Sequence, residues 1–389
     1  MSLNLLIGEY RTPVLIALIL GLILRVALII ATPFNEPARV GKLSAYNDEP
    51  AHVSYTSHIV NSGTLPRTIS PITQSSRRSL PTFENYQSPL SYILHAVACK
   101  PLNVKSADGI AATGRWLSLV YMSLLFLVAV AITSELSRLV SVESRSILLI
   151  FLALSGVFVR FSTLAGNEML SWLMLGWIVM AYVFHERYES ARNFYWLIIA
   201  FILGIYVKLT VLLLAPLLAL VLARTYSTNR SRAIIGFIYV FVATIPLAAY
   251  NYYVFGSPIP LSAGFGDPVM RLPGLETLLY VSRSAVFPWS ELWRNWVGLA
   301  LFTPALVALG WVVFGIVKKM RDVPWAFLIS LSSMAGFLWL NLRYDQAEGR
   351  YLLVAWPALI IGIEALPLKL RSPWLWLIIL LLPYLLFVF

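Results

Sequence analysis

Long apolar runs, each bounded by charged or polar residues, make up most of the chain. The first covers residues 12–32, and a long polar stretch at 33–113 separates it from the others. The others lie at 114–134, 146–164, 169–185, 194–223, 233–255, 296–317, 324–341, 351–366 and 373–389. A helix of about 20 apolar residues crosses the hydrocarbon core of a bilayer, and only helices and closed barrels can do so. The pattern therefore predicts an all-α polytopic membrane protein.

The run at 194–223 is flanked on both sides by basic segments, His185–Arg192 and Arg224–Arg232. Basic flanks belong in the cytoplasm, so the chain must reverse direction within the run. We place this turn at Lys208-Leu209-Thr210, which leaves two short helical arms. The chain then has about 11 transmembrane helices and a cytoplasmic N-terminus.

This arrangement agrees with the positive-inside rule, because every predicted inner loop carries at least two Lys or Arg residues. Those loops are 135–145, 186–193, 224–232, 318–323 and 367–372. The extracytoplasmic side receives the long first loop, 33–113, and a second sizeable loop at 256–295. Within the first loop we expect two interfacial helices, one starting at Pro50 and one covering 88–101. Residues 1–389 are predicted to form a single integral membrane domain, which in a prokaryote would lie in the plasma or inner membrane.

Composition supports the same class of protein. Hydrophobic residues make up 59% of the chain and charged residues 12%, whereas soluble domains carry about 25% charged residues. The net charge of +11 is explained by cytoplasmic loops and anionic lipid, so no nucleic-acid partner is predicted. Cys99 is the only cysteine, which excludes an intrachain disulfide.

Two adjacent carboxylates, Asp48 and Glu49, stand directly before Pro50 in a chain that is otherwise poor in charge. Capping of the helix that Pro50 opens would explain a carboxylate at this place. A carboxylate at the membrane face would equally suit a general base acting on an acceptor hydroxyl. His52 lies one helical turn after Asp48, where it could orient the acid, help to hold a metal or belong to an interfacial surface.

Further polar residues fall on the same predicted outer side. Glu84 and Gln87 lie in the long loop, where the alternative for Glu84 is a solvated loop charge. Asn167 and Glu168 lie between two spans, and they could either cap the next helix or serve a site.

Basic residues on this side could bind an anion. Lys208 lies within a span and needs an anionic partner, which a lipid phosphate or an internal salt bridge to Asp48 or Glu168 would supply. Arg343 and Arg350 have the geometry to clamp a phosphate, with ordinary interface anchoring as the alternative. The sequence has no Walker loop, no dinucleotide fingerprint and no zinc-binding Cys/His set, which argues against direct nucleotide use.

A series of motifs in the chain resembles those of C-type (GT-C) polyprenyl-phosphate-sugar glycosyltransferases. The similarity is greatest to the protein O-mannosyltransferase-like and aminoarabinose-transferase-like branches. The motifs are Asp48–His52, Gly63–Pro66, Gln87–Tyr92, Ala165–Glu168, Lys208–Thr210, Asn251–Pro258 and Glu348–Tyr351. Three positions depart from the pattern: Gln87 replaces a lysine, Ser88 replaces a proline and Glu168 replaces an aspartate.

This resemblance implies a GT-C-like helical bundle. It also implies an inverting transfer of one sugar from a polyprenyl-phosphate donor to a protein, lipid or glycan hydroxyl on the extracytoplasmic face. Asp48 would be the general base, with Glu49 and Glu168 as the other catalytic groups. Substrate binding is implied for His52, Glu84, Gln87, Asn167, Lys208, Arg343, Arg350 and Tyr351. No cofactor is required, and a divalent metal is compatible with the chemistry.

Two other classes of function remain open. Charged residues within spans also occur in transporters of ions or lipids. A non-catalytic relative that binds a polyprenyl lipid and scaffolds a glycan synthase complex would preserve much of the same pattern. Charges gathered at one membrane face favour the enzyme over the transporter, and an assay of transfer separates the enzyme from the scaffold.

Overall fold

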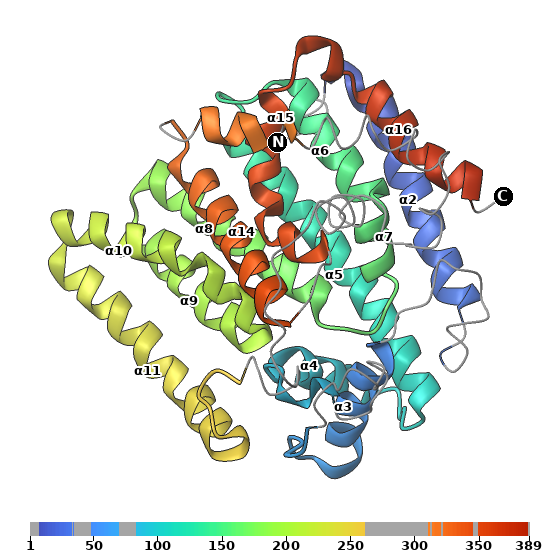
Figure 1. The fold of residues 1–389 in the computed structure, drawn as a ribbon, viewed down its shortest axis with the longest axis vertical. Helices are drawn as coiled ribbons and strands as arrows, with labels where there is room; N and C mark the ends of the chain where they lie inside the picture. Colours follow the sequence, from blue (N-terminus) through green and yellow to red (C-terminus); the bar gives the residue numbers. More distant parts are fainter. Residues whose placement is uncertain are drawn as a thin grey trace. The chain divides into compact units, whose positions relative to one another are not determined.

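The computed structural model of the chain describes residues 8–32, 34, 48–69, 83–260, 310–311, 313–319, 322–344 and 349–387. Every regular element in these ranges is helical (Figure 1). The chain divides into two compact units. The first comprises Met1–Ala27, Leu124–Arg160 and Met270–Phe389, and the second comprises Leu28–Ser123 and Phe161–Val269. The single membrane domain expected from the sequence stays a prediction.

The second unit holds most of the predicted site residues. Its elements are α3 (Glu49–Ser62), η2 (Phe83–Tyr86), α4 (Leu90–Cys99), α8 (Glu168–Tyr188), α9 (Ala191–Val207), η3 (Leu209–Leu214), α10 (Ala215–Thr228), α11 (Arg230–Phe255) and the first part of α5 (Ala107–Glu135). Pro50 lies in the first turn of α3, and Gly63 ends that helix with a φ of 70°. This left-handed conformation costs glycine little, which explains the position of the helix end.

The chain reverses direction at Lys208. The helix α9 ends at Val207, and Lys208 itself is extended, with φ −160° and ψ 133°. Lys208 Nζ lies 2.9 Å from Glu168 Oε1 at the start of α8. Near the other end of α8, Glu186 Oε2 lies 2.7 Å from Arg224 Nη1, close to the end of α10. The polypeptide therefore runs back along α8 in α9 and returns in η3 and α10, so the apolar run is two arms and not one helix.

A buried histidine joins α3, α4 and α5. Thr56 Oγ1 lies 3.1 Å from His95 Nδ1, and His95 Nε2 lies 2.7 Å from the carbonyl oxygen of Ile110. A carbonyl only accepts, so Nε2 carries the proton and Thr56 donates to Nδ1. Burial lowers the pKa of His95 to about 4, which keeps the ring neutral. A Cβ atom at Gly114 would lie 2.4 Å from His95 Cε1, so α5 approaches α4 closely only because residue 114 is glycine.

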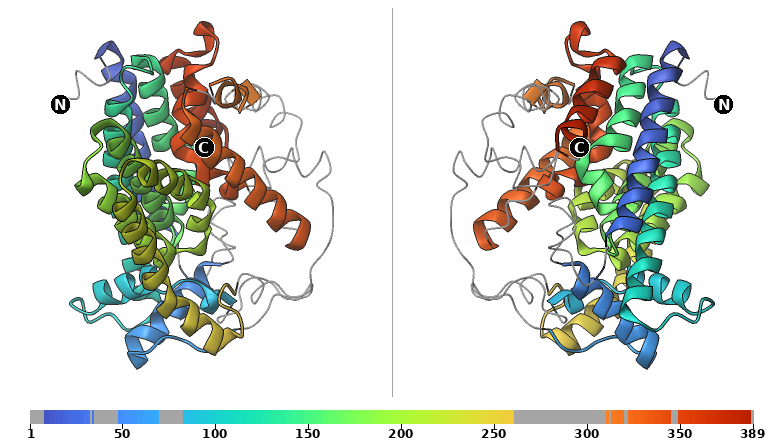
Figure 2. Two further views of the ribbon diagram at one scale, coloured as in Figure 1. Left: turned by 90° about the vertical axis from the view of Figure 1, so that its left-hand side faces the viewer. Right: turned by 90° about the vertical axis from the view of Figure 1, so that its right-hand side faces the viewer.

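The far end of α11 lies beside the segment that follows α3. Tyr250 donates a hydrogen bond of 2.9 Å to the carbonyl oxygen of Pro66, and both views in Figure 2 place the end of α11 next to this segment. On its other side α11 packs along α9, where Tyr206 donates a hydrogen bond of 2.7 Å to the carbonyl oxygen of Ala243. These contacts hold α11 within the second unit.

The first unit is built on α2 (Arg11–Ala31), whose residues up to Ala27 belong to it. It also contains the last part of α5 and a series of C-terminal helices. The remaining elements are α6 (Val142–Leu154), α7 (Gly156–Phe161), α14 (Pro324–Tyr344), η5 (Gly349–Ala358), α15 (Leu359–Glu364), η6 (Leu368–Leu370) and α16 (Pro373–Phe387). The apolar run at 146–164, predicted as one span, is instead two helices broken at Ser155.

A buried arginine explains how the chain tolerates the break at Ser155. The final carbonyls of a helix have no partner within it and need other donors. Arg25 donates 2.6 Å and 3.1 Å hydrogen bonds to the carbonyl oxygens of Ala153 and Leu152. Tyr384 donates one of 2.9 Å to the carbonyl oxygen of Leu154. Three successive carbonyls at the end of α6 thus receive side-chain donors.

Five helical segments among the described residues are long and apolar enough to cross a membrane. They are Gly8–Ala31, Ala107–Glu135, Glu168–Tyr188, Leu209–Thr228 and Arg230–Phe255. The shorter apolar helix α9 completes the reversal at Lys208. The predicted run at 296–317 lies largely outside the described residues. The total of about 11 spans and the assignment of membrane sides therefore stay predictions.

Candidate active site

Asp48 and Glu49 are both buried at the start of α3, but they have different surroundings. Asp48 is the N-cap residue by position, yet its side chain makes no capping hydrogen bond. Glu49 accepts hydrogen bonds from Arg115 Nε and Nη2 at 2.8 and 2.7 Å, and from the backbone N–H of Ala165 at 2.8 Å. Capping therefore does not explain Asp48, and a bidentate ion pair accounts for Glu49.

Arg115 is the principal site residue that the sequence analysis missed. Besides Glu49, its guanidinium also binds the carbonyl oxygen of Thr32 at the end of α2. Its side chain is 4% exposed and that of Glu49 is 3% exposed. One signal was present in the sequence, since an arginine in the first turns of an apolar run needs an anionic or carbonyl partner. Which partner it takes could not be inferred from sequence.

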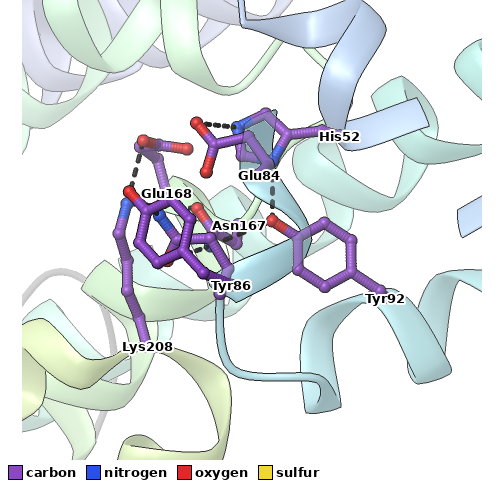
Figure 3. Close-up of polar contacts among 8 residues, drawn as sticks. His52, Glu84, Tyr86, Tyr92, Asn167, Glu168 and Lys208 are labelled. Atoms are coloured by element: carbon purple, nitrogen blue, oxygen red, sulfur yellow. Dashed lines mark hydrogen bonds and ion pairs between the residues drawn. The ribbon is translucent and has the colours of Figure 1, made fainter. Parts of the chain in front are cut away.

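A chain of hydrogen bonds connects α3, α4 and the start of α8 (Figure 3). Asn167 Nδ2 donates to the Tyr92 hydroxyl at 3.3 Å and to Gln87 Oε1 at 3.4 Å. Burial raises the pKa of Tyr92 well above its ordinary value, so this hydroxyl keeps its proton. It donates that proton to His52 Nδ1, 2.7 Å away. The proton of a neutral His52 ring is therefore on Nε2.

Glu84 faces the Nε2 side of His52. Glu84 Oε1 lies 3.9 Å from His52 Nε2, and the Glu84 side chain is 6% exposed. Burial, reinforced by the negative charge of Asp48, raises the pKa of Glu84 to about 8, although the ammonium of Lys208 acts in the opposite direction. Glu84 is therefore mostly protonated at pH 7. Glu84 is therefore buried and not the solvated loop charge that the sequence offered as the alternative.

Lys208 closes the cluster from the reversal between α9 and η3. Its Nζ atom donates to Glu168 Oε1 at 2.9 Å and to Asn167 Oδ1 at 3.1 Å. Asn167 is the N-cap residue of α8 but makes no capping hydrogen bond through its side chain. A Cβ atom at Gly166 would lie 3.1 Å from Glu168 Oε2 and 3.5 Å from His52 Cδ2, which places Glu168 beside His52. The internal salt bridge weighed from the sequence is present.

The three C-terminal candidates belong to the first unit. Arg343 lies in the last turn of α14, and Arg350 and Tyr351 lie at the start of η5. Their side chains fall outside the described part of the structure. Substrate binding by these residues therefore stays a prediction.

The cluster brings together acids in distinct protonation environments. Arg115 binds Glu49, Lys208 binds Glu168, and Glu84 holds a proton at neutral pH. A carboxyl group with a perturbed pKa, such as that of Glu84, is found at functional sites more often than elsewhere. Among the described residues, no group of three or more His, Cys, Asp or Glu side chains is arranged to hold a metal ion. A role for a divalent metal stays a prediction.

Neither protein-family models nor the sequences of curated proteins match the chain. Solved structures do match. ArnT from Cupriavidus metallidurans in the apo state aligns with a TM-score of 0.57 at 13% identity, over 91% of this chain and 60% of ArnT. ArnT bound to undecaprenyl phosphate aligns with a TM-score of 0.56 at 14% identity, over the same shares. The apo oligosaccharyltransferase of Archaeoglobus fulgidus aligns with a TM-score of 0.55 at 12% identity, over 92% of this chain and 50% of that one.

The chain therefore has the GT-C fold of these membrane glycosyltransferases, as the resemblance of its motifs predicted. Its long apolar helices and this fold together identify an integral membrane protein. The chain spans 60% of the length of ArnT and 50% of that of the oligosaccharyltransferase. One fold supports many activities, and the residues of the site determine which substrates are used.

Proposed function

We propose that the protein transfers a sugar from a polyprenyl-phosphate donor to an acceptor hydroxyl on the extracytoplasmic face, with inversion at the anomeric carbon. The acceptor oxygen forms a bond to C1 while the bond from C1 to the phosphate oxygen breaks. The electron pair of the broken bond leaves with the lipid phosphate, and the acceptor proton passes to a carboxylate. The fold supports this reaction class, since one solved relative, ArnT, is bound to undecaprenyl phosphate.

The observation that carries the proposal is the position of Asp48 among neighbouring acids. Glu49 is held by Arg115 and Glu168 by Lys208, so each of these carboxylates is already engaged with a cation. Glu84 is mostly protonated at pH 7 and cannot accept a second proton. Asp48, buried at the start of α3 and without a capping role, is then the best candidate for the general base.

The same geometry gives Glu49 a role that differs from the one expected for it. We assigned it to the catalytic group from the sequence, but both of its oxygens are engaged with Arg115. It is better described as a positioning residue, because the Glu49–Arg115 pair fixes the first turn of α3 and hence the backbone of Asp48. Glu168 is likewise a positioning residue, which holds the ammonium group of Lys208.

Lys208 is the described residue best suited to the leaving phosphate. An ammonium group has three N–H donors, and Asn167 and Glu168 receive two of them. The third could meet a phosphate oxygen as negative charge develops on it. Phosphate binding by Arg343 and Arg350 stays a prediction from the sequence. The neutral acceptor and the sugar would face the side formed by His52 and Glu84.

Reconstituted protein, supplied with short-chain polyprenyl-phosphate sugars and a panel of hydroxyl acceptors, tests the function directly. We expect one donor to yield polyprenyl phosphate and a glycosylated product of opposite anomeric configuration, detected by mass spectrometry and NMR. Asp48→Asn should reduce turnover by about 100-fold or more, as loss of a general base does.

Asp108→Asn is the matched control, because Asp108 is an exposed acid in the first turn of α5. It should retain the full rate. Full activity in Asp48→Asn would exclude Asp48 as the base, and absence of transfer with every donor would favour a lipid-binding scaffold.

A further inference from the structure

An apolar groove runs between α9 and α11, on a part of the second unit away from the acidic cluster. Its volume is about 650 Å³, and its α9 side is formed by Tyr195, Ile198, Ile199 and Ile202. This volume falls within the range of sites that bind small ligands, about 300–1,000 Å³. Its lining is mainly apolar, which suits an apolar ligand.

Close contacts between the two helices border the groove. A Cβ atom at Gly236 would lie 2.5 Å from Phe194 Cζ, so the helices touch near their N-terminal ends. Farther along, Tyr206 donates its hydrogen bond to the carbonyl oxygen of Ala243. The rings of Tyr195 and Tyr239 lie 6.2 Å apart between these contacts.

Each wall of the groove leads to an arginine. On α9, Tyr195 and Ile202 follow Arg192 by three and ten residues, which places them on one helical face. On α11, Tyr239 and Ala243 follow Arg232 by seven and eleven residues, again on one face. Arg192 is exposed and Arg232 is half-buried.

Both arginines lie at the same end of the helices. The ion pair between Arg224 and Glu186 already places the α8–α9 and α10–α11 connections together. These connections are also the ones for which the sequence predicts a cytoplasmic location, because of their positive charge. An anionic group at this end would be attracted, and a cationic one repelled.

The distance from Arg192 to the far end of the groove matches the thickness of one leaflet of a bilayer. Ten residues of α-helix separate Arg192 from Ile202, which corresponds to about 15 Å along the axis. The hydrocarbon core of one leaflet is about 15 Å thick. With Arg192 at the level of the headgroups, Ile202 lies near the middle of the membrane.

We propose that the groove between α9 and α11 binds one acyl chain of an anionic phospholipid from the cytoplasmic leaflet, whose headgroup contacts Arg192 and Arg232. The site is independent of the proposed sugar transfer, and its two arginines lie at the opposite end of the helices from Lys208. Its ligand class follows from an apolar groove that shares its helical faces with two cations, with its far end about one leaflet's depth from Arg192. A polyprenyl chain would fit the apolar walls, but the proposed transfer holds its phosphate at the Lys208 end.

Native mass spectrometry of the full chain tests the proposal. The protein is released from mixed micelles that contain equal amounts of phosphatidylglycerol and phosphatidylcholine. We expect one phosphatidylglycerol to remain bound per chain. The double variant Arg192→Gln/Arg232→Gln should retain about thirtyfold less of it, since each basic residue near an anionic headgroup makes a separate favourable contact.

Two matched controls distinguish binding at this groove from non-specific attraction to positive charge and from non-specific binding to apolar surface. Arg138→Gln/Lys318→Gln removes the same charge at exposed positions of the first unit and should retain the lipid. Val242→Trp fills the groove and should lose the lipid. Ile238→Trp, at a similarly exposed position of α11 outside the groove, should keep it.

Three outcomes would overturn the proposal. The first is that Arg192→Gln/Arg232→Gln and Arg138→Gln/Lys318→Gln retain equal amounts of lipid, and the second is that the protein retains the two phospholipids equally. The third is that added polyprenyl phosphate displaces phosphatidylglycerol stoichiometrically. The last outcome would assign the groove to the donor lipid. Unchanged melting temperatures in all variants ensure that a loss of lipid reports on the site and not on folding.

Discussion

Two arginine–carboxylate pairs among the described residues of the second unit have the same nitrogen–oxygen distance of 2.7 Å and different burial. In the Arg115–Glu49 pair the side chains are 4% and 3% exposed, and in the Arg224–Glu186 pair they are 46% and 37% exposed. A charge left alone in the interior loses its partner and also lacks hydration, whereas an exposed charge returns to water.

Removal of one partner should therefore have very different costs at the two places. Arg115→Met should destabilise the protein by about 3–5 kcal/mol, and Arg224→Met by at most about 1 kcal/mol. Thermal unfolding in detergent measures both. The double variant Glu49→Gln/Arg115→Met should be more stable than Arg115→Met alone, because no buried charge is left unpaired. If the double variant instead lost the sum of the stabilities lost by the two single variants, this account of the pair would be wrong.

The Glu84 carboxyl gives stability a dependence on pH. Its pKa rises from 4.5 to about 8 on folding, so the folded state favours the protonated form. The stabilising contribution is therefore complete below pH 4.5 and is lost as the pH rises towards 8, by up to about 1.4 kcal/mol per pH unit. Glu84→Gln mimics the protonated form. Its melting temperature should fall less than that of the unmodified protein between pH 6 and pH 9, and equal slopes would contradict the assignment.

At the scale of single elements, the sequence predicted the ends of helices where local chemistry marks them. The helix expected to start at Pro50 is α3, and the basic flanks of the run 194–223 required a reversal that the structure has at Lys208. The break at Ser155 was not predicted. Its only local signal is the Ser155-Gly156 pair inside an apolar run, while the residues that stabilise it, Arg25 and Tyr384, are remote in sequence.

The break between α6 and α7 should depend on those remote donors. Arg25→Met removes the hydrogen bonds to the carbonyl oxygens of Ala153 and Leu152, whereas Tyr384→Phe removes only the one to Leu154. Each buried carbonyl left without a donor costs about 1–3 kcal/mol. Arg25→Met should therefore lower the melting temperature about twice as much as Tyr384→Phe does. An equal or reversed order would show that the carbonyls obtain other donors.

At the scale of the whole molecule, the fold class was within reach of the sequence because bilayer thickness and loop charge are strong constraints. The pairs of residues that contact one another within the site could not be predicted from the sequence. Nothing local indicates that Arg115 binds Glu49, that Tyr92 binds His52 or that Lys208 binds Glu168, since these pairs form only after distant helices pack. The sequence therefore pointed to several residues that the fold brings together, but not to the partners that each of them contacts.

The predicted membrane sides can be tested on the intact protein. In a Cys99→Ala background, a cysteine introduced at the exposed Ser62, at the end of α3, should react with an impermeant thiol reagent added outside cells. A cysteine at the exposed Ser227, near the end of α10, should react only after the membrane is made permeable. The reverse pattern would invert the topology and place the acidic cluster in the cytoplasm.

The ion pair between Arg115 and Glu49 also sets the order in which parts of the protein can fold during synthesis. These residues are separated by 66 positions, so during translation Glu49 leaves the ribosome well before its partner exists. Until α5 is made, the acid has to stay in water, and the first turn of α3 cannot settle into its final place. The acidic cluster can therefore form only after α5 has been synthesised. In an arrested nascent chain that ends before Arg115, Glu49 should still be exposed to solvent.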